Sequence, residues 1–269
     1  MWDSIWRCIL LLLAVGALAS PVLAADNDLS ANAKDTEFGM TGVLHLLLLD
    51  TLLLDTPPAV PRPLNDTGIT WGGDYPSGNN TTCTSNIDAP QDCHQGRDAI
   101  HNDSTDGHGG FSYTKLDQSG NSLPTAATTW SCVRDNVTGL VWEVKTDDDS
   151  IHDKDIIYRW GGKTALGKGS GTYYPDWDTL VEGSNTERLC GYSDWRVPTR
   201  AELEGLVHYG RINPAIDTDY FPSTPASGFW SASPNMNSSY AWYVNFYYGE
   251  ACHEIRHIYL HVRLVRSGR

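Results

Sequence analysis

The pattern H-E-x-x-H near the C-terminus is the feature of this chain with the most direct chemical meaning. It is formed by His253, Glu254 and His257. In zinc hydrolases the pattern lies on a helix, where histidines four residues apart bind one metal ion and the glutamate acts as the base. A zinc hydrolase acting through His253, Glu254 and His257 is therefore one alternative for this chain.

The residues that follow this pattern favour a strand. From His257 to Leu264, apolar side chains alternate with polar or aromatic ones, which is the period of two of a β-strand. One face would point into the core and carry Ile258, Leu260, Val262 and Leu264. The other face would point to solvent and carry His257, Tyr259, His261 and Arg263. We therefore interpret the zinc pattern as a coincidence of strand residues.

A polar, aromatic strand face is well suited to recognition, because Tyr and His provide large contact areas at a low entropic cost. With the preceding loop, the expected ligand-binding residues are Asn235, Asn237, Tyr240, His253, Ile255, His257, Tyr259 and His261. An ordinary solvated strand face is the alternative. Local positive charge, suited to an anionic glycan, is expected from Arg256, Arg263, Arg266 and Arg269, although the chain has a formal net charge of -14.

Two further groups of residues could bind metal. Asp147, Asp148 and Asp149, with Asp153 and Asp155, could supply oxygen ligands to Ca²⁺, but such runs are more often solvated loops. The histidines His94, His101 and His108 lie seven residues apart in a Gly-rich segment, where loop histidines are the simpler interpretation. No catalytic carboxylate pair, nucleophile elbow or phosphate loop is recognisable. We therefore expect no cofactor, with Ca²⁺ as the alternative, and we expect no enzyme activity.

Several elements must position these residues. Thr199 and Glu202 form a capping box, and Leu203, Leu206 and Val207 share one face, so a helix is predicted over about 200–208. A second short helix is predicted from Trp177 to a stop at Gly183. Most of the remainder alternates or is aromatic and predicts short strands. The tryptophans Trp142, Trp195, Trp230 and Trp242 are expected in the core.

The cysteines point to an oxidising compartment. Cys83 and Cys93 are predicted to close one small loop, and Cys132 with Cys190 is the next most plausible bridge. Cys252 would then remain, either as a free thiol or as an intermolecular partner. Redox use of Cys252 would need a partner cysteine, and the sequence does not identify one.

The chain divides into four predicted regions. Residues 1–24 resemble a secretory signal, residues 25–63 a spacer, residues 64–130 a loop-rich extension without helices, and residues 131–269 the folded core. The Leu-rich run 43–54 in the spacer is too short and too interrupted to predict a membrane span. The acidic charge disfavours nucleic acid as a partner. We expect an exported protein, periplasmic, secreted or on the cell surface, without a stable membrane span after processing.

Several phrases of this core are similar to a known family. They are Cys132 to Glu143, Leu189 to Leu203, Asn213 to Thr218 with Tyr220-Phe221-Pro222, Trp230 to Ser233, and Val262 to Arg266. In this order they resemble the Lcl C-terminal domain family of exported bacterial proteins, over about residues 131–268. The resemblance implies an α+β, C-type-lectin-like fold, similar to the formylglycine-generating-enzyme variant of that fold.

The resemblance also implies a class of function. Characterised relatives bind at cell surfaces, including to sulfated glycans, and some are the target proteins of diversity-generating retroelements that mutate a C-terminal cassette. Here the flanks match the family while the interval from Glu250 to His261 differs from it. We therefore expect an adhesion-type protein that binds a cell-surface protein or glycan. Because fold does not determine function, an enzyme is the alternative, either the zinc hydrolase or an oxidase of the formylglycine-generating type.

Overall fold

A computed structural model describes residues 63–74, 78–80, 91–100, 104–167 and 169–268 of the chain. The predicted signal, almost all of the spacer with its Leu-rich run, Cys83, His101 and Arg269 lie outside the described residues. The described residues fall within one compact unit, Arg62–Arg269. In the described part of the chain, no helix has the length and apolar character that are needed to cross a membrane.

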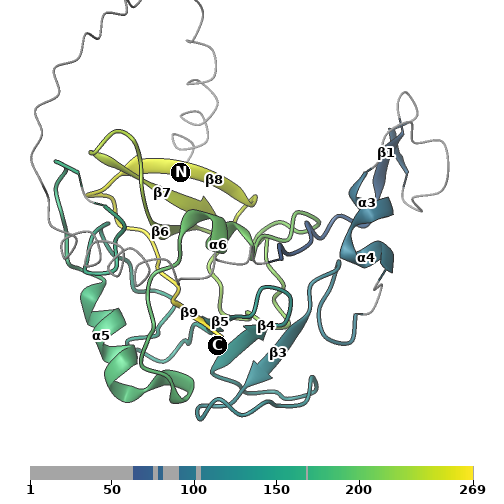
Figure 1. The fold of residues 1–269 in the computed structure, drawn as a ribbon, viewed down its shortest axis with the longest axis horizontal. Helices are drawn as coiled ribbons and strands as arrows, with labels where there is room; N and C mark the ends of the chain where they lie inside the picture. Colours follow the sequence, from purple (N-terminus) through teal and green to yellow (C-terminus); the bar gives the residue numbers. More distant parts are fainter. Residues whose placement is uncertain (1–62, 75–77, 81–90, 101–103, 168, 269) are drawn as a thin grey trace, which may run out of the picture. The chain divides into compact units, whose positions relative to one another are not determined.

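A four-stranded antiparallel sheet forms one part of this unit (Figure 1). Its strands, in spatial order, are β3 (Tyr113–Leu116), β4 (Cys132–Asp135), β5 (Leu140–Glu143) and β9 (Val265–Ser267). The turn between β4 and β5 is held by Asp135, whose Oδ1 accepts the N–H groups of Val137 and Thr138 at 2.9 and 3.0 Å. Gly139 completes this turn in the left-handed region, with φ +71°. The chain's last strand thus pairs with a strand more than one hundred residues earlier.

A three-stranded antiparallel sheet carries most of the residues expected to bind a ligand. It consists of β6 (Gly228–Pro234), β7 (Tyr240–Asn245) and β8 (Glu250–Ile255), in that order. The outer side of β6 is joined to the segment after β8, because Trp230 N–H donates to the carbonyl of His261 at 2.8 Å. A small hairpin of β1 (Gly72–Asp74) and β2 (Gly78–Asn80) is separate from both sheets.

The helices are short. Besides α5 (Asp178–Glu187), the 3-10 helix η2 (Leu189–Gly191) and α6 (Arg200–Glu204), two single turns, α3 (Asp92–Gln95) and α4 (Arg97–Ile100), lie in the stretch that was expected to contain none. The capping box of α6 is confirmed, and Leu203, Leu206 and Val207 are buried. α6 ends at Glu204 rather than near residue 208. α5 continues past Gly183, since buried Leu180, Val181 and Ser184 outweigh the roughly 1 kcal/mol cost of a helical glycine.

The predicted strand over 257–264 is wrong. β8 ends at Ile255, and a turn follows in which Ile258 N–H donates to the carbonyl of Ile255 at 3.0 Å. The chain then runs past two different partners, because Leu260 pairs with Tyr158 and His261 pairs with Phe229. Ile258 is exposed and Arg263 is fully buried, the reverse of the expected faces. The two-residue alternation continues through this segment, but the backbone does not follow it.

The arginines of this segment lie in the interior rather than on the surface. Arg256, Arg263 and Arg266 are exposed by 2, 0 and 5%, respectively. Arg256 lies over the ring of Trp160 at 4.2 Å, and Arg263 over that of Phe221 at 4.9 Å. Burial lowers the pKa of Arg263 to about 10. The expected patch of positive charge for an anionic glycan is therefore not formed by these three residues.

The core explains the aromatic content of the chain. The main cluster lies between the two sheets' strands and α6, and it includes Phe111, Trp142, Phe221, Phe229 and Phe246. Trp142, Trp195 and Trp230 are buried as expected, whereas Trp242 is only half-buried. The disulfide between Cys132 and Cys190 is confirmed and joins β4 to η2. The chain is therefore α+β, with short strands, few helices and long loops.

Candidate functional site

One face of the β7–β8 hairpin carries a continuous row of half-buried aromatic side chains. Directly paired residues of antiparallel strands point to the same face of the sheet, and here the pairs are Tyr240 with Ile255 and Trp242 with His253. The ring of His253 is 5.5 Å from that of Tyr240 and 5.5 Å from that of Trp242, in T-shaped geometry. We call these four residues and Arg200 the aromatic face.

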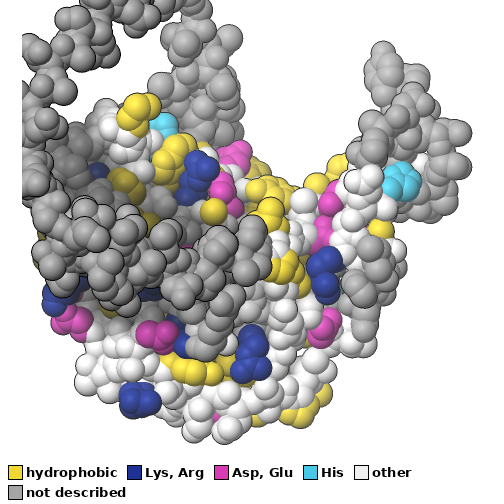
Figure 2. Space-filling model, in the orientation of Figure 1, with side chains coloured by type: hydrophobic (Ala, Val, Ile, Leu, Met, Phe, Trp, Pro, Cys, Tyr) yellow, Lys and Arg dark blue, Asp and Glu magenta, His cyan; other side chains and the backbone are white. Residues whose placement is uncertain are grey.

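Arg200 completes this face from the first position of α6. Its guanidinium lies 4.5 Å from the ring centroid of Trp242, within the range of a cation–π interaction. Its backbone N–H donates to Oγ of Ser233 on β6 at 3.0 Å, which fixes the start of α6 against the sheet. Glu204 lies 3.5 Å from Arg200, so the charge of this arginine is partly balanced. Hydrophobic, His and Lys/Arg side chains are visible together above this sheet (Figure 2).

The N-terminus of α6 is held in place by a second arginine. Arg196 donates to both carboxylate oxygens of Glu202 at 2.7 and 2.8 Å, and Glu202 accepts the backbone N–H of Thr199 at 2.9 Å. Although burial alone would raise the pKa of Glu202, these bonds lower it below its usual value. Glu202 is therefore ionised at neutral pH and keeps the helix that carries Arg200 in a fixed position.

The structure divides the expected ligand-binding residues among four places. Tyr240, His253 and Ile255 lie together on the aromatic face. Asn235 and Asn237 lie in the turn between β6 and β7, where their side-chain oxygens accept backbone N–H groups two residues further on, at 3.0 Å each. These two amides therefore shape the turn. Between them, Met236 is fully exposed at the tip of the hairpin.

His257 and Tyr259 lie in the turn after β8, away from the strand row. Both are exposed, and Tyr259 forms part of a second group of polar and aromatic residues. Arg159 lies 4.4 Å from the ring of Tyr174 and 5.4 Å from that of Tyr259. Asp176 accepts two hydrogen bonds from Arg159 at 2.8 and 3.0 Å, which hold this guanidinium near the two rings.

His261 is half-buried, and its place on a ligand surface stays a prediction. Its ring lies 5.2 Å from that of Phe229, and its Nδ1 is buried without a hydrogen-bond partner among the described residues. Burial lowers the pKa of His261, which keeps the imidazole neutral. The ring of His261 therefore packs against Phe229, and its backbone pairs alongside β6.

The residues of the H-E-x-x-H pattern do not have the helical geometry that zinc hydrolases use. His253 and Glu254 are neighbours on β8 and point to opposite faces, while His257 lies in the turn that follows. Cys252, also on β8, and Cys93 are both disulfide-bonded. Neither is therefore a free thiol. The pairing of Cys93 with Cys83 stays a prediction, because Cys83 lies outside the described residues.

Acidic residues meet in the loop after β5. One carboxylate oxygen each from Asp147, Asp153 and Asp155 lie within 4.8 Å of one another. Lys154 bonds to both Asp147 and Asp155, at 3.0 and 2.7 Å, so an ammonium already balances these charges. Asp153 accepts the backbone N–H groups of Asp148, Asp149 and Asp155 at 2.8 Å each. These bonds stabilise the loop. Calcium binding here stays a prediction.

Sequence reasoning did not assign two residues of the aromatic face, Trp242 and Arg200, to a binding site. Trp242 was expected in the core with the other tryptophans, yet its place two residues after Tyr240 on a strand predicts that both share one face. Arg200 carries no local signal beyond its position after the capping residue. Its contact with Trp242 depends on how α6 packs against β7, which only the tertiary structure shows.

Comparison with known proteins adds one finding. The family described as the Lcl C-terminal domain matches residues 131–266, about half of the chain. The matched segment contains both strands of the aromatic face and α6. No curated protein matches this chain.

Proposed function

Because this chain belongs to the Lcl C-terminal domain family through residues 131–266, we propose that it is an exported, non-enzymatic binding protein of the adhesion type. Its fold in this proposal is C-type-lectin-like. The aromatic face, formed by Arg200, Tyr240, Trp242, His253 and Ile255, is its ligand-binding surface. The ligand is a protein or a glycan at a cell surface.

The observation that carries this proposal is the half-buried row of Tyr240, His253 and Trp242 with Arg200 above it. Trp, Tyr and Arg are the residue types enriched at the energetic centres of binding interfaces. A solvated strand face would carry small polar or charged side chains, and three adjacent aromatic rings on it would expose apolar area without a use. The row therefore favours recognition over simple solvation.

The scaffold under this row is rigid, which suits a preformed binding surface. Val244 continues the same face of β7 into the core and is fully buried, and α6 is fixed by the bonds of Glu202. Fewer side chains then need to be ordered when a ligand binds, so that less binding free energy is lost.

The proposal is tested with a panel of immobilised glycans and surface proteins, screened with and without calcium. For any ligand found, Trp242→Ala and His253→Ala should each weaken binding by at least roughly 2 kcal/mol, or about 30-fold in Kd. Affinities equal to the wild-type value for both variants would contradict the proposal. Thermal unfolding of both variants checks that the fold is intact.

The matched controls are His257→Ala and Tyr259→Ala. These residues are of the same types and are exposed, but they lie in the turn after β8 and not on the aromatic face. We expect less than a threefold change in Kd for either one, since residues outside an interface centre contribute little. A loss confined to His257 and Tyr259 would move the ligand site to the neighbouring group with Arg159 and Tyr174.

We also propose that the interval from Glu250 to His261 was diversified as the target of a retroelement. This interval spans the second strand of the aromatic face and the exposed turn after it. An adjacent, nearly identical DNA template that differs at adenines would support this proposal. A locus without such a template would contradict it, and it would leave the binding proposal unaffected.

A further inference from the structure

A pocket of about 330 Å³ lies outside the aromatic face, and residues from three segments far apart in the sequence line it. Gly68, Thr70 and Trp71 come from the segment before β1, and Ser104 to Gly110 from the loop before β3. The third wall, with His208, Gly210 and Arg211, follows α6. Only this third wall lies within the segment that matches the family.

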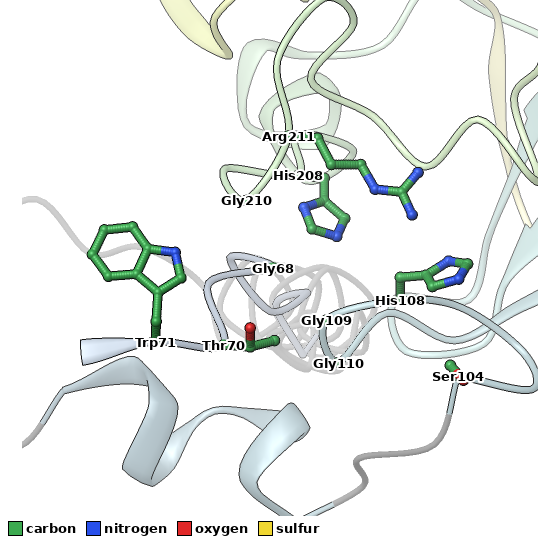
Figure 3. Close-up of a pocket in the computed structure, with 10 residues that line it drawn as sticks. All are labelled: Gly68, Thr70, Trp71, Ser104, His108, Gly109, Gly110, His208, Gly210 and Arg211. Carbon is green, nitrogen blue, oxygen red and sulfur yellow. The ribbon is translucent and has the colours of Figure 1, made fainter. Parts of the chain in front are cut away.

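Glycines form the floor of the pocket (Figure 3). Gly68 has φ +76°, and a Cβ atom there would lie 2.5 Å from Nδ1 of His208. A Cβ atom at Gly109 would lie 2.7 Å from the Cα of Gly68. Side chains at these positions would therefore displace the imidazole or close the pocket. The bare backbone keeps the floor open.

The described lining residues include one permanent cation, Arg211, and no carboxylate. Two histidines, two hydroxyl groups and the indole N–H of Trp71 add further polar groups. This composition is unusual in a chain with a net charge of -14. Burial lowers the pKa of His208, so its imidazole adds no charge at neutral pH. The lining thus offers mainly hydrogen-bond donors and a single positive charge.

Asp217 is a buried residue that bonds to two of the residues lining the pocket, His108 and Arg211. Its side chain is 1% exposed, and its Oδ2 accepts from Nδ1 of His108 at 2.8 Å. Its Oδ1 accepts from one guanidinium nitrogen of Arg211 at 3.3 Å. Within the described part of the chain, the other guanidinium nitrogens of Arg211 make no hydrogen bond. Arg211 is therefore oriented by a buried carboxylate and keeps donors for a ligand.

Trp71 stands at the side of the pocket opposite His108, with its ring partly exposed (Figure 3). We propose that the pocket binds a small ring compound that bears one carboxylate group. The carboxylate lies at Arg211, because the guanidinium fork matches the geometry of a carboxylate. The ring lies on the glycine floor against Trp71. Asp217 is bonded to Arg211, and Asp219 lies 3.6 Å from Nε2 of His108, so these carboxylates disfavour a ligand with more than one negative charge.

The ligand can be a sugar acid or an aromatic acid, and titration calorimetry of the full chain distinguishes the two. The probes are glucuronate and benzoate, with glucose and benzamide as uncharged counterparts. We expect saturable binding of at least one acid and at least tenfold weaker binding of its uncharged counterpart. If neither acid binds, or if inorganic phosphate competes as well as the bound acid, the proposal is wrong.

Variants locate the site. Arg211→Gln should weaken binding of the acid by roughly tenfold to a hundredfold, as expected for a lost hydrogen bond to a charged group. Arg211→Lys keeps the charge beside Asp217 and should also weaken binding, because it lacks the fork. Trp71→Ala should reduce affinity without lowering the melting temperature. Arg134→Gln, on β4, is the matched control and should bind normally; unchanged binding in Arg211→Gln and Arg211→Lys would overturn the assignment.

Discussion

Glu143 is a buried carboxylate at the end of β5 in the four-stranded sheet. It is fully buried, and its Oε1 accepts from Lys145 at 3.0 Å and from Nδ1 of His152 at 2.7 Å. Its Oε2 accepts the backbone N–H of Leu264 at 2.8 Å. Burial alone would raise the pKa of Glu143, but the charges and bonds of Lys145 and His152 outweigh burial and lower it to about 2.

Replacing this carboxylate should be costly because its partners would stay behind. Glu143→Gln leaves Lys145, which is exposed by only 3%, as a buried charge without its counter-ion. We expect the free energy of unfolding to fall by about 3–5 kcal/mol, the typical effect of breaking a buried ion pair from one side. Urea unfolding at neutral pH measures this change.

The matched control is Glu187→Gln, which also removes a carboxylate bonded to His152. The side chain of Glu187 is 46% exposed, so water can replace its interaction. We expect a loss of no more than about 1 kcal/mol. Equal losses in the two variants would show that burial of Glu143 is not what makes it important.

At the scale of residues, the sequence patterns predicted the burial of two side chains wrongly. Alternation placed Arg263 on a solvent face, but it lies in the core, where Oγ of Thr224 and the backbone carbonyl of Glu143 accept its hydrogen bonds. Trp242 shows the opposite error, since its size suggested burial. Neither position is determined locally, because each depends on partners that lie far away in the sequence.

At the scale of elements, α6 is the helix whose first residue the sequence predicts most directly. The hydroxyl of Thr199 accepts the backbone N–H of Glu202 at 3.2 Å, and the carboxylate of Glu202 accepts the N–H of Thr199. Thr199→Ala should therefore lower the free energy of unfolding by about 1 kcal/mol. Thermal or urea unfolding checks this value.

Because α6 carries Arg200, the same variant should also weaken ligand binding slightly if the aromatic face is the binding surface. Thr186→Ala, on the exposed side of α5, is a control of the same residue type, and we expect a change within about 0.5 kcal/mol. A destabilisation by Thr199→Ala that is no larger than that of Thr186→Ala would mean that the capping box does not hold α6.

Elements with local signals were predicted and elements defined by pairing were not. Local capping chemistry located α6, and short strands were expected throughout the core. The end of β8 at Ile255 was missed, because the apolar alternation continues to Leu264 while the backbone turns to pair with Tyr158 and Phe229. The single-turn helices α3 and α4 have too few residues for a periodic pattern to form.

At the scale of the whole molecule, long-range contacts close the fold. β9 pairs with β5, β3 pairs with β4, and the disulfide of Cys132 with Cys190 links residues 58 positions apart. The sequence predicted this disulfide and the α+β class, but it did not predict the order of strands in each sheet. The pocket at Arg211 was also missed, since its three walls meet only in the folded chain.

The buried network around Glu143 should make the stability of the whole molecule depend on pH in a defined direction. Burial, the largest influence, would lower the pKa of His152, but bonds and charges from Glu143 and Glu187 outweigh it and raise this pKa above 6.5. A protonated His152 therefore stabilises the fold at a pH below 6.5, and this contribution is lost as the pH rises through the raised pKa. Glu143 acts in the opposite direction: its contribution is complete above pH 4.5 and is lost as the pH falls towards about 2.

The two effects together predict that this network stabilises the fold most between pH 4.5 and 6.5. The net charge of -14 also destabilises the chain as the pH rises, so the measurement must isolate His152. We expect the difference in unfolding free energy between the wild type and His152→Gln to shrink from about pH 6 to about pH 9. Urea unfolding across this range tests it, and a difference that is constant or that grows would show that His152 is not charged between Glu143 and Glu187.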